Sequence, residues 1–403
     1  MTKPRRVMAG AERRETGGMV DNTSLSAAKR VKNDEFYTQY SDIEAEMNAY
    51  YEYDHDVFRG KTVLCPCDDP EWSNFTKYFA ANFKRFGLKK LISTSYAKSA
   101  GNHMTTLVES SSPLYNPDEH DIHGKLFTMT GDEDDSGEVD VDDIRFSGYL
   151  KGDGDFRSAE VKRLRDEADI IVTNPPFSLF REFLAWIFEA DKQFIIVGST
   201  NAITYKEVFP LLKSNMVWLG YNEGGSRKGN SMFFVVPAEY DNQYVTTDEH
   251  GKRLMQTSAK WFTNIDHGKR HQPLQLDTMA HNLKFNKKLK RKLEKDYGKL
   301  EYPHYDNYDA IEVPFTECIP SDYDGVMGVP ITFMDKYDPD QFEIIGSFNN
   351  SNINEKQREC FVLSRDTETI INGVEKVWNG PVINKIPLYK RIVIRLKKGS
   401  NDR

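Results

Sequence analysis

Four consecutive residues, Asn174-Pro175-Pro176-Phe177, follow an apolar run and have the types needed to act on a poorly nucleophilic amine. The Asn174 side-chain oxygen and the Pro175 carbonyl can each accept one amine hydrogen, which holds the nitrogen in line with an electrophile. The prolines, Pro175 and Pro176, stiffen the backbone and add no competing donor. Phe177 offers a stacking face worth about 1–3 kcal/mol per base. The motif alone predicts methylation of an sp² nitrogen without choosing between nucleic acid and protein; a turn that merely ends a strand is the alternative.

The loop Cys65-Pro66-Cys67-Asp68-Asp69-Pro70 could hold a cofactor because of its position. It follows the first apolar run and precedes a helix start, whose spare N–H groups suit a polar ligand. It contains no glycine, so position alone makes Cys67 and Asp68 candidate cofactor-binding residues. A surface turn is the alternative interpretation.

The segment Lys151-Gly152-Asp153-Gly154-Asp155-Phe156 joins a carboxylate to an aromatic ring. That pair suits an adenine ring: Asp155 could accept a hydrogen bond from its amine, and Phe156 could stack on its face. We therefore expect both residues to bind a cofactor. A flexible Gly-Asp turn is the alternative.

Five residues are candidates for contact with a nucleic acid. Arg227 and Lys228 lie in a Gly- and Ser-rich loop, and Lys287 and Lys288 begin a basic helical run that reaches residue 295. Solvated surface is the alternative for both pairs. Phe262 could place a ring beside a nucleobase, although packing in the core is the favoured interpretation of that apolar segment.

The apolar pattern predicts an α/β fold in which strands alternate with helices, typical of a parallel sheet covered on both faces. Strands are expected at residues 61–67, 88–96, 169–173 and 194–199. Helices are expected at residues 42–53, 73–86, 158–168 and 179–190. Because ligands bind at the carboxyl ends of strands in such sheets, Asn174 would face the site.

Composition divides the chain into three parts. Residues 1–33 mix Gly, Ser and Arg without periodicity and are expected to be a disordered basic arm. Residues 34–270 form the predicted catalytic domain, interrupted at 98–148 by an acidic insertion or loop. Residues 271–403 begin with a basic helical stretch and continue with short strand-like pieces, among them 328–334, 341–346, 360–363 and 391–396.

The net charge of −8 is unusual for a nucleic-acid-binding protein, but distribution matters more than the sum. The acids concentrate between residues 118 and 143. Two basic segments, the N-terminal arm and residues 284–299, could face phosphates. No apolar run approaches the ~20 residues of a membrane helix, and the N-terminus has no secretory pattern, so a cytoplasmic location is expected. The spacings of the four cysteines and of His267 and His271 predict neither disulfides nor a metal site.

Several stretches together resemble the EcoRI-type adenine-specific DNA modification methylases, from about residue 33 to about residue 346. They are Asp34-Glu35-Phe36-Tyr37-Thr38-Gln39-Tyr40, Cys67-Asp68-Asp69-Pro70, Leu150 to Ser158, Thr173 to Glu182, Asn201 to Glu207, Trp261 to Asn264 and Met327 to Phe333. The family similarly has an atypical Asp-Asp-Pro turn after its first strand. The arm, the acidic stretch and the last fifty or so residues match less well.

The resemblance implies a Rossmann-like S-adenosylmethionine-dependent methyltransferase sheet with a mainly β C-terminal target-recognition region. It implies methyl transfer from S-adenosyl-L-methionine to N6 of adenine in duplex DNA, with the base flipped into the Asn-Pro-Pro-Phe pocket. Phe36, Tyr37 and Thr38 would cradle the methionine end of the cofactor, although Gln39 stands where the family usually has proline. Such an enzyme works in a restriction–modification system beside a separate endonuclease, or alone, and is expected to be a monomer.

Two alternatives remain open. Enzymes that methylate a protein glutamine or an RNA base use related motifs, often with Tyr in the fourth position, whereas Phe177 and the long C-terminal region favour DNA. A catalytically inactive DNA-binding module is the other alternative, and the intact motif argues against it.

Overall fold

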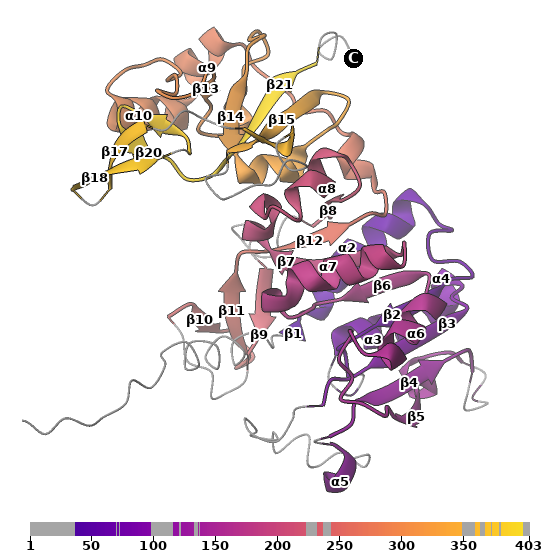
Figure 1. Cartoon of the computed structure of the whole chain (residues 1–403). Helices are drawn as coiled ribbons and strands as arrows, with labels where there is room; N and C mark the ends of the chain where they lie inside the picture. Colours follow the sequence, from indigo (N-terminus) through magenta and orange to yellow (C-terminus); the bar gives the residue numbers. More distant parts are fainter. Residues whose placement is uncertain are drawn as a thin grey trace, which may run out of the picture. The chain divides into compact units, whose positions relative to one another are not determined.

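The computed structural model describes residues 37–397 except for a set of short gaps (Figure 1). The gaps are 70, 72, 98–115, 121, 133–135, 137, 223–231, 237–242, 349–358, 363–366, 372 and 379. The expected basic arm, Phe36 and the loop with Arg227 and Lys228 therefore lie outside the described residues.

A mixed eight-stranded sheet forms the centre of the chain, in the order β5-β4-β3-β2-β6-β7-β12-β8. Its strands are β2 (Thr62–Cys65), β3 (Lys90–Thr94), β4 (Lys125–Met129), β5 (Arg145–Tyr149), β6 (Ile170–Thr173), β7 (Gln193–Ser199), β8 (Trp218–Leu219) and β12 (Ala259–Thr263). The four middle strands, β3, β2, β6 and β7, are parallel as expected. The sheet as a whole is mixed rather than parallel, because β4 and β12, which were not predicted, run antiparallel to their neighbours.

The stretch at 98–148, expected to be an acidic insertion or loop, supplies β4 and most of β5. Within it, α5 (Pro117–His120) precedes β4. Because β5 and β3 are both antiparallel to β4, they run in the same direction. The loop that follows β5 therefore emerges at the edge where β2 and β6 also end.

Helices cover both faces of this sheet, as alternating strand residues require. In β6, Ile170 and Val172 join an apolar cluster with α2 (Tyr40–Tyr53) and α3 (Asn74–Ala81). Ile171 points the other way, into a cluster with α6 (Ala159–Glu167) and α7 (Phe180–Glu189). Figure 1 shows α6 and α7 lying across one face of the strands.

Local capping interactions fix the ends of the helices. Ser73 caps α3 and Ser158 caps α6, each accepting a backbone N–H bond with its hydroxyl. The helix expected at 73–86 is divided at Asn82 into α3 and α4 (Phe83–Phe86), and Gly87 ends it in the left-handed conformation, with φ 63°.

A second, antiparallel sheet was not expected from the sequence. It orders four strands as β1 (Tyr37–Thr38), β9 (Met232–Val235), β11 (Arg253–Thr257) and β10 (Val245–Thr247). Thr38 pairs with Phe234 across β1 and β9. The segment before the first helix is thereby joined to one nearly two hundred residues later.

The C-terminal part combines helices and strands. The helices are α9 (Met279–Phe285) and α10 (Lys287–Tyr297). The strands are β13 (Ile311–Glu312), β14 (Met327–Pro330), β15 (Phe342–Phe348), β16 (Phe361–Val362), β17 (Thr367–Ile371), β18 (Val374–Trp378), β19 (Val382–Ile383), β20 (Ile386–Pro387) and β21 (Arg391–Leu396). The strand expected at 328–334 ends early, because residues Ile331–Lys336 form a 3₁₀ helix.

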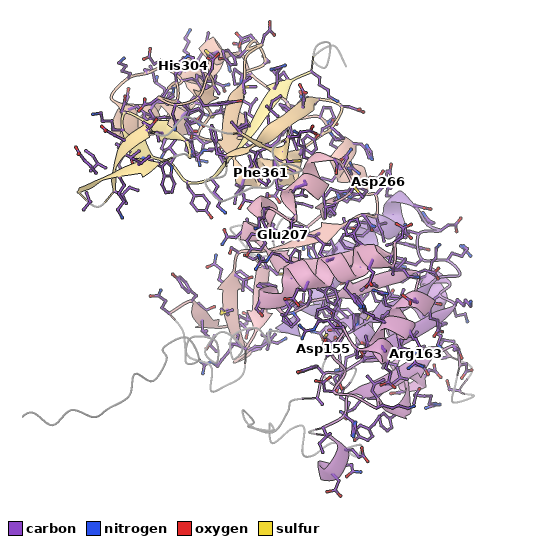
Figure 2. The ribbon with its side chains drawn as sticks, viewed as in Figure 1. Asp155, Arg163, Glu207, Asp266, His304 and Phe361 are labelled. Atoms are coloured by element: carbon purple, nitrogen blue, oxygen red, sulfur yellow. The ribbon has the colours of Figure 1, made fainter. Side chains whose placement is uncertain are left out.

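The apolar core continues from the central sheet into this C-terminal part through α8 (Phe209–Lys213). Phe209 packs on Phe361, which Figure 2 labels, with ring centroids 5.4 Å apart. Lys213 Nζ donates to the Ile345 carbonyl at 2.9 Å. The boundary placed at residue 270 stays a prediction. None of the helices in the described ranges is both long and apolar enough to cross a membrane.

Candidate active site

The Asn-Pro-Pro-Phe motif leaves the carboxyl end of β6 and meets the N-terminal segment. Asn174 Nδ2 donates to Thr38 Oγ1 at 3.3 Å across 136 positions of sequence. Thr38 is buried, and Asn74 at the start of α3 donates to its carbonyl oxygen at 2.8 Å. Two of the motifs singled out in the sequence are thus in contact, and α3 holds the backbone of one of them.

Phe177 lies half-buried at the start of the 3₁₀ helix Phe177–Leu179. Its ring packs edge-on against Phe234 of β9, with centroids 6.2 Å apart at 61°. Sequence reasoning missed Phe234, although the run of five apolar residues from 232 to 236 is a strand signal. β9 therefore supports both Thr38, by strand pairing, and Phe177, by ring contact.

The glycine-free loop after β2 reaches a glycine-like backbone conformation at Cys67, where φ is 65°. A non-glycine residue is strained there, and such strain is concentrated at functional sites. The Asp68 N–H donates to the Thr94 carbonyl at 2.7 Å, which joins the loop to the end of β3. The loop therefore adopts at Cys67 the left-handed backbone conformation that a glycine would adopt without strain.

Asp68 fixes this loop from inside. Its Oδ1 accepts from the Ser73 hydroxyl at 2.9 Å and its Oδ2 from the Thr173 hydroxyl at 2.5 Å. Burial raises the pKa of Asp68 to about 7, although both hydroxyl bonds lower it. The carboxyl therefore joins the β2 loop to the cap of α3 and to the residue before Asn174.

Asp155 lies on the loop that joins β5 to α6 (Figure 2). The preceding Gly154 has φ 85°, and a Cβ there would overlap the Ser95 carbonyl oxygen. The Ala97 N–H also donates to the Asp153 carbonyl at 2.6 Å, so this loop packs against the end of β3. The Gly-Asp turn is thus held in place at the same sheet edge as Asp68 and Asn174.

The Asp155 carboxylate is bound by the Arg157 guanidinium, with Nη2 at 2.6 Å from Oδ2 and Nε at 2.9 Å from Oδ1. These hydrogen bonds lower the pKa of Asp155 below its ordinary value. Arg157 also donates to Glu182 on α7 at 3.0 Å. Asp155 is therefore an ionised acceptor, held by an arginine on its own loop.

Two aromatic residues that the sequence offers for binding lie in the core. Phe156 is 3% exposed and packs on Phe183 and Trp186, so the structure gives its ring no open face for stacking. Phe262 is fully buried, with its ring 5.0 Å from that of Phe180. The core packing that the sequence favours for Phe262 is confirmed, and its alternative contact with DNA is wrong, because the ring fills the core between β12 and α7.

The two lysines at the start of α10 differ in their surroundings. Lys288 Nζ donates to Glu317 at 2.9 Å and lies over the Phe315 ring at 3.9 Å. Lys287 is exposed. Within the ranges described, no three His, Cys, Asp or Glu side chains gather as metal ligands. The four cysteines are free thiols, two buried and two half-buried.

Comparison with known proteins first defines the class. The family model described as "Adenine-specific methyltransferase EcoRI" matches residues 24–397. With its large mixed α/β sheet, the chain is an adenine-specific methyltransferase.

Two relatives then define the group within that class. The Type II methyltransferase M.EcoRI of Escherichia coli is 43% identical over 328 residues, which is 80% of this chain and 89% of that protein. The Type II methyltransferase M.MpnI of Mycoplasma pneumoniae is 34% identical over 81% of this chain and 86% of its own length. The chain belongs to the EcoRI adenine-specific methyltransferase family. No solved structure gives a significant match.

Proposed function

We propose that this methyltransferase transfers a methyl group from S-adenosyl-L-methionine to N6 of adenine in duplex DNA, at a specific site. The observation that carries the proposal is the contact between Asn174, at the carboxyl end of β6, and Thr38 of the N-terminal motif. The Type II names of the relatives support DNA as the substrate.

The strand order supports a Rossmann-like cofactor-binding sheet. Four parallel strands lie in the middle, and the antiparallel β12 lies between β7 and β8. In open α/β sheets the ligand binds outside the carboxyl ends of the strands. The loops after β2, β5 and β6 meet at that edge and carry Asp68, Asp155 and Asn174.

The chemistry of this edge fits S-adenosylmethionine, which carries positive sulfonium and ammonium groups. Asp155 is ionised on the loop after β5, and the loop after β2 presents the Asp68 carboxyl, whose pKa is about 7. Thr38, Cys67 and Asp68 would line the methionine end, and Asp155 would accept from the adenine amine. Phe36 and Tyr37 keep the role that the family motif implies for them.

The cofactor when bound supplies an electrophilic methyl group on sulfur. Asn174 and the Pro175 carbonyl would accept the two N6 hydrogens of the target adenine and align its nitrogen with that methyl group. Because the Asn174 amide nitrogen is directed to Thr38, its oxygen lies on the opposite side of the planar amide. Phe177, braced by Phe234, would stack on the flipped base, and Pro176 keeps the intervening backbone stiff.

Residues 271–403 are proposed to recognise the DNA target. Lys287 of α10 would contact a phosphate, and Lys288, which is paired with Glu317, would contribute less. Arg227 and Lys228, which precede this part of the chain, would also contact phosphates. A cognate restriction endonuclease would act as a separate protein. Target recognition and methyl transfer would then be divided between the C-terminal part and the central sheet, which share one apolar core.

The test combines a labelled cofactor, duplex genomic DNA and the Asn174→Ala variant. We expect N6-methyladenine from the wild type, no turnover from the variant, and similar binding of S-adenosylmethionine to both in calorimetry. Asn116→Ala, at an exposed asparagine before α5, is the control that should keep activity. Genomic DNA that stays free of N6-methyladenine would refute the proposal, and single-molecule sequencing would read out the target site.

A further inference from the structure

Lys125 stands at a position where the strand pattern calls for an apolar residue. β4 alternates inward and outward, and Lys125, Phe127 and Met129 share its buried face. The Lys125 side chain is 2% exposed. A buried charge that breaks the local pattern marks a functional or strained position.

The lysine reaches from β4 to the loop after β2. Its Nζ donates to Asp69 Oδ2 at 2.8 Å and to Glu71 Oε2 at 2.6 Å, and both carboxylates are less than a fifth exposed. Burial alone would lower the pKa of Lys125, but these two carboxylates together raise it above its ordinary value. Lys125 is therefore a cation shared by two residues of the cofactor loop.

The backbone of Lys125 is fixed independently of its side chain. Its N–H donates to the Ser95 hydroxyl at 2.9 Å, and its carbonyl accepts from the Ser95 N–H at 3.0 Å. Ser95 directly follows β3, whose Thr94 carbonyl binds the Asp68 N–H. The backbone of Lys125 is thus held rigidly beside the loop after β2, to which its ammonium group is hydrogen-bonded.

Stability alone does not explain such an arrangement. Replacing a buried ion pair by apolar residues of similar volume is often neutral or stabilising, so a retained pair calls for another role. The loop without glycine carries a strained Cys67 and needs its shape held from outside. The cation at Lys125 also limits repulsion between Asp69 and Glu71.

We infer that Lys125 is a positioning residue for the cofactor: it fixes Asp69 and Glu71 so that the glycine-free loop keeps the shape that binds S-adenosylmethionine. This inference rests on the proposed function. It concerns affinity for the cofactor, since Lys125 itself is too buried to touch the reacting atoms. Loss of the ammonium group should therefore weaken cofactor binding more than it slows the chemical step.

The experiment compares Lys125→Met with Lys90→Met in the full-length chain. Lys90 is a matched control, because it also lies in the central sheet and pairs with Glu167 at 2.7 Å, but at the amino end of β3. Calorimetry with S-adenosylmethionine, and steady-state kinetics with cofactor and DNA varied in turn, are measured for each. For Lys125→Met we expect the cofactor Kd and KM to rise about tenfold, equivalent to one buried polar contact.

At saturating cofactor the kcat and the KM for DNA should stay close to the wild type, and Lys90→Met should match the wild type in cofactor Kd. A purely structural role would instead lower the active fraction, so that kcat falls while the cofactor Kd does not change. That result in a folded Lys125→Met protein would overturn the inference.

A second variant covers the case in which Lys125→Met does not fold. Glu71→Gln keeps the pair between Lys125 and Asp69 and should raise the cofactor Kd by a smaller factor. A folded Glu71→Gln protein with the wild-type Kd would then reject the inference. If the wild type itself binds no S-adenosylmethionine, the proposed function fails and this inference fails with it.

Discussion

At the scale of single residues, the hydroxyl of Thr38 is the contact that orients Asn174. Thr38→Val removes that hydroxyl at nearly constant volume, so the amide loses this hydrogen bond while β1 can still pair with β9. We expect kcat to fall by up to about tenfold, because one hydrogen bond contributes about 0.5–1.5 kcal/mol. Steady-state methylation kinetics at saturating cofactor measure the change.

Thr38→Ser is the matched control, since it keeps the hydroxyl and loses only a methyl group. It should retain most of the wild-type kcat. Equal rates in the Ser and Val variants would show that the hydroxyl does not orient Asn174.

The buried carboxyl of Asp68 makes a second prediction at this scale. Burial raises its pKa from 3.8 to about 7, so the folded protein binds more protons than the unfolded chain between about pH 4 and pH 7. The contribution of Asp68 to the free energy of unfolding should therefore decrease as pH rises through that window, by at most about 1.4 kcal/mol per pH unit. Urea unfolding between pH 5 and pH 8 measures the slope.

Asp68→Asn should remove this contribution, so the wild type should lose more stability than the variant as pH rises from 5 to 7. Glu46 on α2 is also fully buried, and burial raises its pKa to about 7, so its contribution has the same sign as that of Asp68. Burial lowers the pKa of His267 to about 4, so its contribution has the opposite sign, and both groups remain in the variant. If Asp68→Asn and the wild type lose stability equally between pH 5 and pH 7, Asp68 does not titrate in this range.

At the scale of elements, the turn between β5 and α6 is held by the close approach of Gly154 to Ser95. Gly154→Ala puts a Cβ against the Ser95 carbonyl at a φ of 85°, so the turn must shift and displace Asp155. We expect a loss of about 1–3 kcal/mol in stability, together with weaker cofactor binding. Thermal unfolding and calorimetry measure the two effects.

Gly152→Ala is the matched control two residues earlier. A Cβ there meets nothing within 4 Å, and its φ is not in the left-handed range. The variant should behave as the wild type in both measurements. Comparable losses in the two alanine variants would mean that the turn is not held by the contact at Gly154.

The sequence predicts the elements that carry strong local signals. The middle strands are uninterrupted apolar runs, and Ser73, Ser158 and Gly87 mark helix ends that the structure has at those residues. The strands β4, β5 and β9 were missed, because each is a short segment beside acidic or polar loops. Their strand conformation depends on partners far away in the chain, which local periodicity does not reveal.

The candidate site was predictable as motifs but not as contacts. Asn174 was predicted from its chemistry and Thr38 from the family resemblance, and the structure brings them together. Packing against α7 decides the burial of Phe156 and Phe262. Residue type alone does not distinguish an aromatic side chain in the core from one in a binding site. Lys125 was not identified because its role depends on ion pairs with Asp69 and Glu71, which lie on another loop.

At the scale of the whole molecule, charge must be sorted by location, because the chain carries −8 overall and is proposed to bind a polyanion. On α10, Lys287 and Arg291 are exposed one turn apart, about 6 Å along the axis. Lys288 is already neutralised by Glu317. On DNA binding, counterion release at this helix should therefore come mainly from phosphate contacts of Lys287 and Arg291.

Lys287→Ala and Lys288→Ala form a matched pair, since each removes one positive charge from the same helix end and changes the net charge equally. We expect Lys287→Ala to reduce the slope of log K against log salt concentration by about 0.9, the value for one phosphate contact, with weaker binding to any sequence. Lys288→Ala should change the slope less, because the ion pair with Glu317 leaves little counterion to release. Fluorescence anisotropy with a labelled duplex at several salt concentrations gives both slopes. Slopes that match the wild type in both variants would remove α10 from the DNA interface and leave the negative net charge to be overcome elsewhere on the chain.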